Sequence, residues 1–169
     1  NGIEESLCEI MNLKNKISSS NLSDTNPAIF LANWITGIPL IYYPYGLESA
    51  AIRFKSSLQE NSKIHVIIED IIESCHNGIV SWEKPSIVQP ILLQGSDDYV
   101  KTKERFEIVA QYFEENNIDY QKVLSVSGNI LTKLISLIYL LDFVSIYKSV
   151  LSKTDPSPVN SINFIKSKI

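Results

Sequence analysis

The chain has 169 residues, of which 44% are hydrophobic and 20% are charged, and its formal net charge at pH 7 is −4. This length and composition suit one globular domain with a full hydrophobic core. The acidic balance argues against a nucleic-acid partner, because neutralising phosphates requires clustered lysine and arginine. The densest basic stretch, residues 148–168, is interrupted by Asp155 and several apolar residues.

Two cysteines and one long apolar stretch bear on where the protein works. Cys8 and Cys75 form no Cys-x-x-Cys pair and no disulfide framework, which is typical of a cytoplasmic protein with reduced thiols. The apolar stretch at residues 130–147 contains Lys133 and Asp142, and a charge inside a bilayer is costly. We therefore expect a buried helix there and no membrane partner. The chain opens with asparagine and without a signal peptide, so an excised or processed fragment is one interpretation.

The first helices are expected within residues 1–36, a helical segment that links domains. An amphipathic helix should end near Ile17, where a polar run begins. A second helix is expected to carry Pro27 in its first turn, with Asp24 or Thr25 as its cap.

From residue 37 onward, strand and helix patterns alternate. Short apolar runs predict buried parallel strands, and apolar residues at helical spacing predict the helices between them. This alternation implies a three-layer α/β/α sandwich with a mostly parallel sheet of four to five strands. The expected strands are residues 38–43, 64–68, 87–93 and 120–126, and the expected helices are residues 47–61, 99–116 and 128–151. A rigid turn at residues 155–158 should precede a short terminal helix, because each proline disfavours helix before it.

Ligands of such sheets bind beyond the carboxyl ends of the strands. The loop at residues 44–48 is poor in hydroxyl groups and carries Glu48, so it is a weak phosphate cradle. The loop at residues 125–129, Ser-Val-Ser-Gly-Asn, is a better one because small polar residues open a helix there. The interpretation that we favour is that Ser127 only caps that helix.

Glu60 and His76 are the candidates for proton transfer. Glu60 ends the helix predicted at residues 47–61 and shares a face with Arg53, Ser56 and Ser57, opposite the apolar stripe. A carboxylate there could be a general base if packing excludes water from it, but by spacing alone a solvated helix end is the better interpretation. His76 stands in a polar loop after a strand, where a proton-transferring group would be useful, although loop histidines are often incidental.

Other chemistry has little support in the residues. The common nucleotide, zinc-protease and serine-hydrolase motifs are absent, so we expect no cofactor and no metal. Cys75 has no visible base that would make it a nucleophile, and Lys166, taken alone, is a surface lysine.

Four stretches, taken in order, resemble the phosphoglucose/phosphomannose isomerases. Residues 53–63, RFKSSLQENSK, are similar to that family's Arg-aromatic-Lys…Asn-Glu-Asn-Ala-Lys segment, and residues 72–77 are similar to its Pro-Glu-x-x-His-Asn loop. Residues 134–145 resemble its long helix, and residues 155–166 resemble its C-terminal Asp-Pro-x-Pro segment and final lysine. The resemblance covers most of the chain from about Asn33 onward. It implies that residues 37–169 are the C-terminal sugar-isomerase (SIS) domain of such an enzyme.

The resemblance also implies roles for individual residues. Glu60 matches the base that moves a proton between C1 and C2 of a sugar phosphate through a cis-enediol(ate). His76 matches the ring-opening histidine, which the neighbouring subunit of a homodimer supplies. Lys166 matches the C-terminal lysine that reaches the active site, and Arg53 and Asn77 match substrate-binding positions. These roles imply a cytoplasmic enzyme of carbohydrate metabolism that converts glucose or mannose 6-phosphate to fructose 6-phosphate.

The sequence departs from the family pattern in three respects. Gly78 stands where the family has glutamate, and Ser62 stands where it has alanine. The chain also lacks the N-terminal SIS subdomain, whose Ser-Gly-Asn-Thr loop holds the phosphate. Because remote binding energy positions the reacting carbons, we expect the chain alone to have little or no isomerase activity.

Two other functions are compatible with the sequence. One is a non-catalytic module that binds sugar phosphates, as SIS domains do in regulators, and the other is an assembly domain whose long helix forms a dimer interface. The intact set of Glu60, His76 and Lys166 favours the enzyme, since a sensor needs neither a base nor a ring-opening acid.

Overall fold

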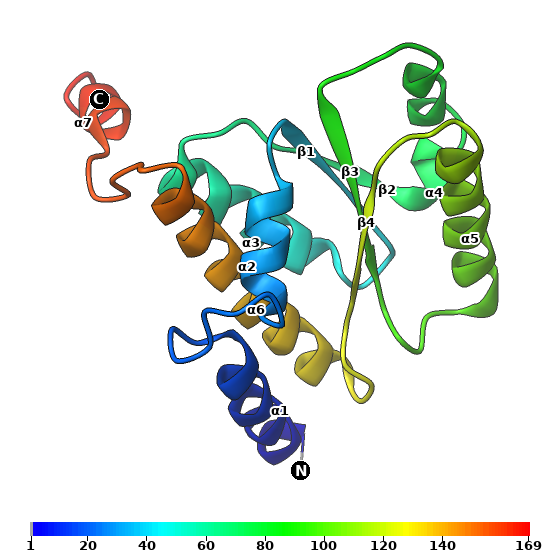
Figure 1. Ribbon diagram of the computed structural model, residues 1–169, viewed down its shortest axis with the longest axis horizontal. Helices are drawn as coiled ribbons and strands as arrows, with labels where there is room; N and C mark the ends of the chain where they lie inside the picture. Colours follow the sequence, from blue (N-terminus) through cyan, green and yellow to red (C-terminus); the bar gives the residue numbers. More distant parts are fainter. Residues whose placement is uncertain (1) are drawn as a thin grey trace.

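The structure, a computed structural model, describes residues 2–169 and contains one parallel sheet between two layers of helices (Figure 1). The four strands follow the order β2-β1-β3-β4, and every strand pair is parallel. The predicted three-layer α/β/α sandwich is therefore confirmed. The strands are β1 (Ile38–Tyr43), β2 (Ile67–Asp70), β3 (Val88–Gln94) and β4 (Gln121–Leu124).

The helices divide between the two faces of the sheet (Figure 1). One face is covered by α1 (Gly2–Ile17), α2 (Pro27–Trp34), α3 (Glu48–Ser57), the π-helical turn η1 (Leu58–Ser62) and α6 (Ile130–Leu151). The other face is covered by α4 (Ile71–Ser74), the 3-10 helix η2 (Gly78–Glu83) and α5 (Val100–Glu115). The short helix α7 (Asn160–Lys166) follows α6 and buries none of its residues.

Strand β1 shows why both layers form. Its Ile41 belongs to the core on the α6 side, whereas Leu40 and Tyr42 belong to the core on the α5 side. Successive side chains of a strand point to opposite faces, so a continuous apolar run suits a strand that is covered on both sides. On the α5 side, Trp82 Nε1 donates a 2.8 Å hydrogen bond to the Tyr42 hydroxyl. Burial raises the pKa of Tyr42 to about 12.

Helix α6 contains the longest apolar stretch of the chain. Of residues 2–169, it is the one helix that could span a membrane when judged by length and composition alone. In the structure, Leu137, Leu141 and Val144 are buried in the core formed with α1, α2, α3 and η1. Ile146 and Val150 are exposed. The helix therefore has one face in the core and one face at the surface.

The parallel register brings the carboxyl ends of the strands to one edge of the sheet. Tyr43 at the end of β1 pairs with Asp70 at the end of β2, and Gln94 of β3 pairs with Leu124 of β4. The chain passes from β1 to β2 on one side and places β3 on the other, so the topological switch point lies between β1 and β3. The sequence predicts the second strand at residues 64–68, but β2 begins later, at Ile67.

The predicted cap of α2 is wrong. Asn26 caps this helix through its Oδ1, which accepts a hydrogen bond from the Ala28 amide at 2.9 Å, whereas the sequence suggests Asp24 or Thr25. A capping residue stands directly before the first helical residue, here Pro27, and only Asn26 has that position.

Candidate functional site

Glu60 lies in η1, the π-helical turn that continues α3. Leu58 and Ser62 of this turn are buried, while Glu60 is exposed. The turn ends at Lys63, whose backbone is left-handed with φ 58°. Short π-helical turns inside α-helices are frequent at functional sites, so this irregularity makes the turn itself a candidate.

Contacts with α6 fix the segment that carries Glu60. Asn61 Nδ2 donates a 2.8 Å hydrogen bond to Ser145 Oγ, and Ser62 Oγ donates a 3.0 Å hydrogen bond to the Ser145 carbonyl. Ser57 Oγ donates a 2.6 Å hydrogen bond to Asp142 Oδ1. Ser57 is only 5% exposed, and it shares with Arg53 the face of α3 that meets Asp142. The sequence pattern shows the helix face but not the α6 carboxylate that it meets.

Arg53 already has a partner within the chain. Its Nε and Nη2 donate hydrogen bonds of 3.0 and 2.9 Å to the two oxygens of Asp142. These hydrogen bonds raise the pKa of Arg53 further above its ordinary value. A substrate-binding Arg53 would therefore have to share this carboxylate.

A pocket of about 470 Å³ lies between η1 and the segment that leads into α7. It is lined by Gln59, Glu60, Lys63, Pro158, Val159, Asn160, Ser161 and Ile162. Lys166 lies in the last turn of α7 and is not among these residues. The structure thus brings Glu60 to the start of the C-terminal helix, whereas Lys166 lies beyond the pocket's lining.

His76 follows α4 on the α5 side of the sheet. It lines a second pocket, of about 430 Å³, together with Cys75, Lys101, Glu104, Arg105 and Ile108. Asn77 Nδ2 donates a 3.2 Å hydrogen bond to Glu73 Oε1, so this amide braces the loop. Burial raises the pKa of the Cys75 thiol above its ordinary value, which disfavours a reactive thiolate. Within one chain, His76 and Glu60 therefore line different pockets on opposite faces of the sheet.

Glu69, near the end of β2, is a residue that sequence patterns do not single out. Its Oε2 is buried and has no hydrogen-bond partner among the described residues, and burial raises its carboxyl pKa above the ordinary value. A side chain at Gly78 would collide with Glu69 Oε2. A larger residue at position 78 would therefore require the Glu69 side chain to move.

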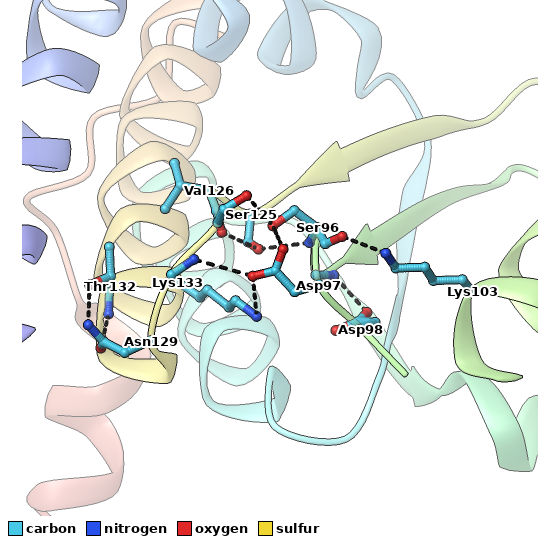
Figure 2. A network of polar contacts seen from close by, with 12 residues as sticks. Ser96, Asp97, Asp98, Lys103, Ser125, Val126, Asn129, Thr132 and Lys133 are labelled. Carbon is cyan, nitrogen blue, oxygen red and sulfur yellow. Dashed lines mark hydrogen bonds and ion pairs between the residues drawn. The ribbon is translucent and has the colours of Figure 1, made fainter. Parts of the chain in front are cut away.

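The carboxyl edge of β3 and β4 holds a network of polar side chains (Figure 2). Asp97 forms a 3.2 Å ion pair with Lys133 and accepts a 3.3 Å hydrogen bond from the Gly128 amide. The hydrogen bond from Lys133 is the largest of the influences that hold the pKa of Asp97 below its ordinary value. Ser125 Oγ accepts a 3.2 Å hydrogen bond from the Ser96 amide, which ties the two loops together. The Asp97 carboxylate is thus the negatively charged group at the centre of this network.

The partial positive charge at the start of α6 is also neutralised by side chains of this chain. Asn129 caps the helix through Oδ1, which accepts a 3.1 Å hydrogen bond from the Thr132 amide, so the predicted cap at Ser127 is wrong. Glu5 Oε2 accepts a 2.9 Å hydrogen bond from Asn129 Nδ2. Helix N-termini attract anions, and here two side-chain carboxylates, Glu5 and Asp97, already lie at that end. The loop that looks like a phosphate cradle in the sequence is therefore filled.

Across residues 2–169, no three His, Cys, Asp or Glu side chains are grouped so as to hold a metal ion.

Comparisons with known proteins agree on one family. Residues 24–169 match the bacterial phospho-glucose isomerase C-terminal SIS domain. A bifunctional phosphoglucose/phosphomannose isomerase from Caldicellulosiruptor bescii is 29% identical over 174 residues, which cover 99% of this chain and 51% of that protein. One from Aquifex aeolicus is 27% identical over 143 residues, which cover 82% of this chain and 45% of that protein. The chain spans about half the length of these curated relatives.

Solved structures show the same fold. A glucose-6-phosphate isomerase-like protein from Thermus thermophilus superposes with a TM-score of 0.74 at 15% identity, over 97% of this chain and 55% of that one. The strand order, the helix layers and the match over residues 24–169 lead to one assignment. The chain belongs to the family of bacterial phosphoglucose isomerase C-terminal SIS domains.

Proposed function

We propose that this chain is the C-terminal half of an enzyme that interconverts glucose 6-phosphate or mannose 6-phosphate with fructose 6-phosphate. The observation that carries the proposal is the pocket in which Glu60 faces the segment leading to α7. Its support is the family assignment together with relatives that are phosphoglucose/phosphomannose isomerases.

Glu60 would act as the base of the isomerisation. Its carboxylate takes the proton from C2 of the open-chain aldose while the C1 oxygen gains a proton, and a cis-enediol results. The hydroxyl on C2 then loses its proton as the C2 carbonyl forms, and Glu60 returns its proton to C1. General acid–base catalysis of this kind typically contributes about 10²- to 10⁴-fold in rate. Lys166 would protonate or stabilise the oxygens on which negative charge develops.

A homodimer would complete the site. His76 and Glu60 lie on opposite faces of the sheet within one chain, so one chain does not bring them together. A second copy that presents its own His76 to the Glu60 pocket would supply the ring-opening acid. Asn77 would serve this step by bracing the loop through Glu73.

The phosphate group needs an anchor from outside this chain. Asp97 accepts a hydrogen bond from the Gly128 amide and Glu5 accepts one from the Asn129 amide, so a dianion at the start of α6 would compete with two carboxylates of the chain. The same competition speaks against a module that binds sugar phosphates by itself. The half of the relatives that this chain does not match would supply the anchor.

A coupled assay tests the proposal. The 169-residue chain would be compared with a joined protein in which it is fused to the half of the Caldicellulosiruptor bescii relative that it does not match. Conversion of fructose 6-phosphate to glucose 6-phosphate should occur in the joined protein and be near background in the chain alone. Equal turnover by both would contradict the need for an outside phosphate anchor. No turnover by the joined protein, with retained sugar-phosphate binding, would favour the non-catalytic module.

A further inference from the structure

Lys63 lies immediately after the turn that carries Glu60, and its ammonium group contacts three backbone carbonyls. Lys63 Nζ donates hydrogen bonds to the Glu60 carbonyl at 2.6 Å, the Pro158 carbonyl at 2.8 Å and the Pro156 carbonyl at 3.3 Å. An ammonium group has three donors and no acceptor, so this arrangement uses all three. One contact is local, and the other two reach across more than ninety residues of sequence to the segment after α6.

The turn that receives these hydrogen bonds is rigid. Proline fixes φ at Pro156 and Pro158, and both carbonyls that face Lys63 belong to these residues. Asp155 Oδ1 accepts a 2.9 Å hydrogen bond from the Ser157 amide. That hydrogen bond is the main reason why the pKa of Asp155 lies below its ordinary value, and the positive charge of Lys63 lowers it further. The turn is therefore ordered locally and complementary in charge to Lys63.

Helix α7 has little else to hold it. None of its residues is buried, and Phe164 and Ile165 are 65% and 58% exposed. Its position relative to Glu60 is therefore set through the turn that precedes it. Hydrogen bonds from a charged donor are stronger than those between neutral groups, so three of them on one ammonium group can order a short segment.

We propose that Lys63 is a positioning residue. It ties the turn at residues 155–158 to the π-helical turn of Glu60, and it thereby sets where α7 and Lys166 stand relative to the general base. The structural part of this inference needs only the hydrogen bonds. The catalytic part rests on the proposed function, because it predicts that loss of the tie misplaces groups that act on the sugar.

Lys153 provides a matched control. Lys63 and Lys153 are both lysines with left-handed backbones, with φ of 58° and 53°. Lys153 donates no side-chain hydrogen bond to any of the residues that the structure describes. Asparagine tolerates the left-handed region and is too short to span this tie. Lys63→Asn and Lys153→Asn therefore remove the same charge and relieve the same backbone strain, but only the first removes the tie.

Millisecond hydrogen–deuterium exchange on the 169-residue chain tests the tie. Amides of residues 157–166 should exchange about ten-fold faster in Lys63→Asn and at the wild-type rate in Lys153→Asn. Lys63→Arg keeps a positive donor and should restore at least part of the protection. Unchanged exchange in Lys63→Asn would overturn the inference, as would equal acceleration in both asparagine variants.

Steady-state kinetics of the joined protein test the consequence. Lys63→Asn should lower kcat by about 10- to 100-fold with little change in KM, because small displacements from reacting geometry affect the rate more than binding. Lys63→Arg should recover part of kcat, and Lys153→Asn should match the wild type. Faster exchange with unchanged kcat would overturn the positioning role while leaving the proposed function intact. An inactive parent protein would overturn the proposed function, whereas the exchange experiment would still decide whether the tie exists.

Discussion

The two ends of α6 lie next to polar loops that have opposite characters. At its N-terminal end, Asp97 pairs with Lys133 (Figure 2). Asp97 and Glu5 together neutralise the helix start. Beyond its C-terminal end, Lys63 binds backbone carbonyls and leaves the Glu60 carboxylate exposed at a pocket. The N-terminal end is therefore a closed end, where carboxylates of the chain already bind the helix start. The C-terminal end is an open end, where the Glu60 carboxylate lines a pocket.

This difference shows where chemistry can occur in this domain. An anion-binding helix start is useful to a sugar phosphate only if its amides are free, and here the Gly128 and Asn129 amides already bind Asp97 and Glu5. A carboxylate is useful as a base only if substrate can reach it, and Glu60 meets that condition. This contrast agrees with the proposal that the chain supplies the base and that the phosphate anchor comes from elsewhere.

The largest effect is expected from removing the base. In the joined protein, Glu60→Gln should lower kcat by about 10²- to 10⁴-fold, because glutamine keeps the shape of the side chain but cannot accept the proton. Glu107→Gln, at an exposed position of α5, changes the net charge by the same amount and should leave kcat unchanged. Similar kcat values for the two variants would show that the open end of α6 carries no general base.

Next in size is the loss of Asp142, which anchors the Glu60 segment to α6. Asp142→Ala removes the acceptor of Ser57, which is 5% exposed, and should lower the free energy of unfolding by about 1 to 3 kcal/mol. Arg53→Ala breaks only an exposed pair and should cost less than about 1 kcal/mol. Urea denaturation measures both values. Equal losses would mean that the buried Ser57 contact contributes little.

At the closed end, the two possible caps of α6 can be separated. Asn129→Ala should lower the free energy of unfolding by about 1 kcal/mol, since it removes the acceptor for the Thr132 amide. Ser127→Ala should stay within about 0.5 kcal/mol of the wild type, because Ser127 does not cap the helix. A larger loss for Ser127→Ala in thermal or urea unfolding would reverse this assignment.

The smallest effect is expected at Asp97, and it depends on pH. The pKa of Asp97 is lowered in the folded state, so its ionised form stabilises the fold above the unfolded-state pKa of about 4. This contribution is lost as the pH falls through the lower folded-state value. The difference in Tm between wild type and Asp97→Asn should therefore be present at pH 7 and shrink in acid. Lys133→Gln removes the partner and should reduce the same difference, whereas a pH-independent gap would contradict the ion pair as its source.

The layers of the fold follow directly from the sequence, but the side-chain contacts of the site do not. Buried strands such as β1 are visible as apolar runs, because a strand covered on both faces needs apolar residues at every position. The partner of Ser57 is Asp142, which lies far away in the sequence, so no local pattern could reveal it. The same holds for Lys63, since the turn at residues 155–158 is predictable but the ammonium group that binds it is not. Predictions of helix caps fail for a different reason. Several neighbouring polar residues could cap the same helix, and only the backbone conformation decides which one does.

The most direct test of the central claim follows the proton itself. The joined protein would convert fructose 6-phosphate to glucose 6-phosphate in D₂O, and NMR would measure deuterium at C2 of the product. With Glu60 as the base of an enediol mechanism, C2 of the product receives either the proton taken from C1 or a deuteron that the Glu60 carboxyl has exchanged with solvent, and formation of product by either route should fall in Glu60→Gln by about 10²- to 10⁴-fold. Formation of product at an unchanged rate in Glu60→Gln would contradict the role assigned to the open end of α6.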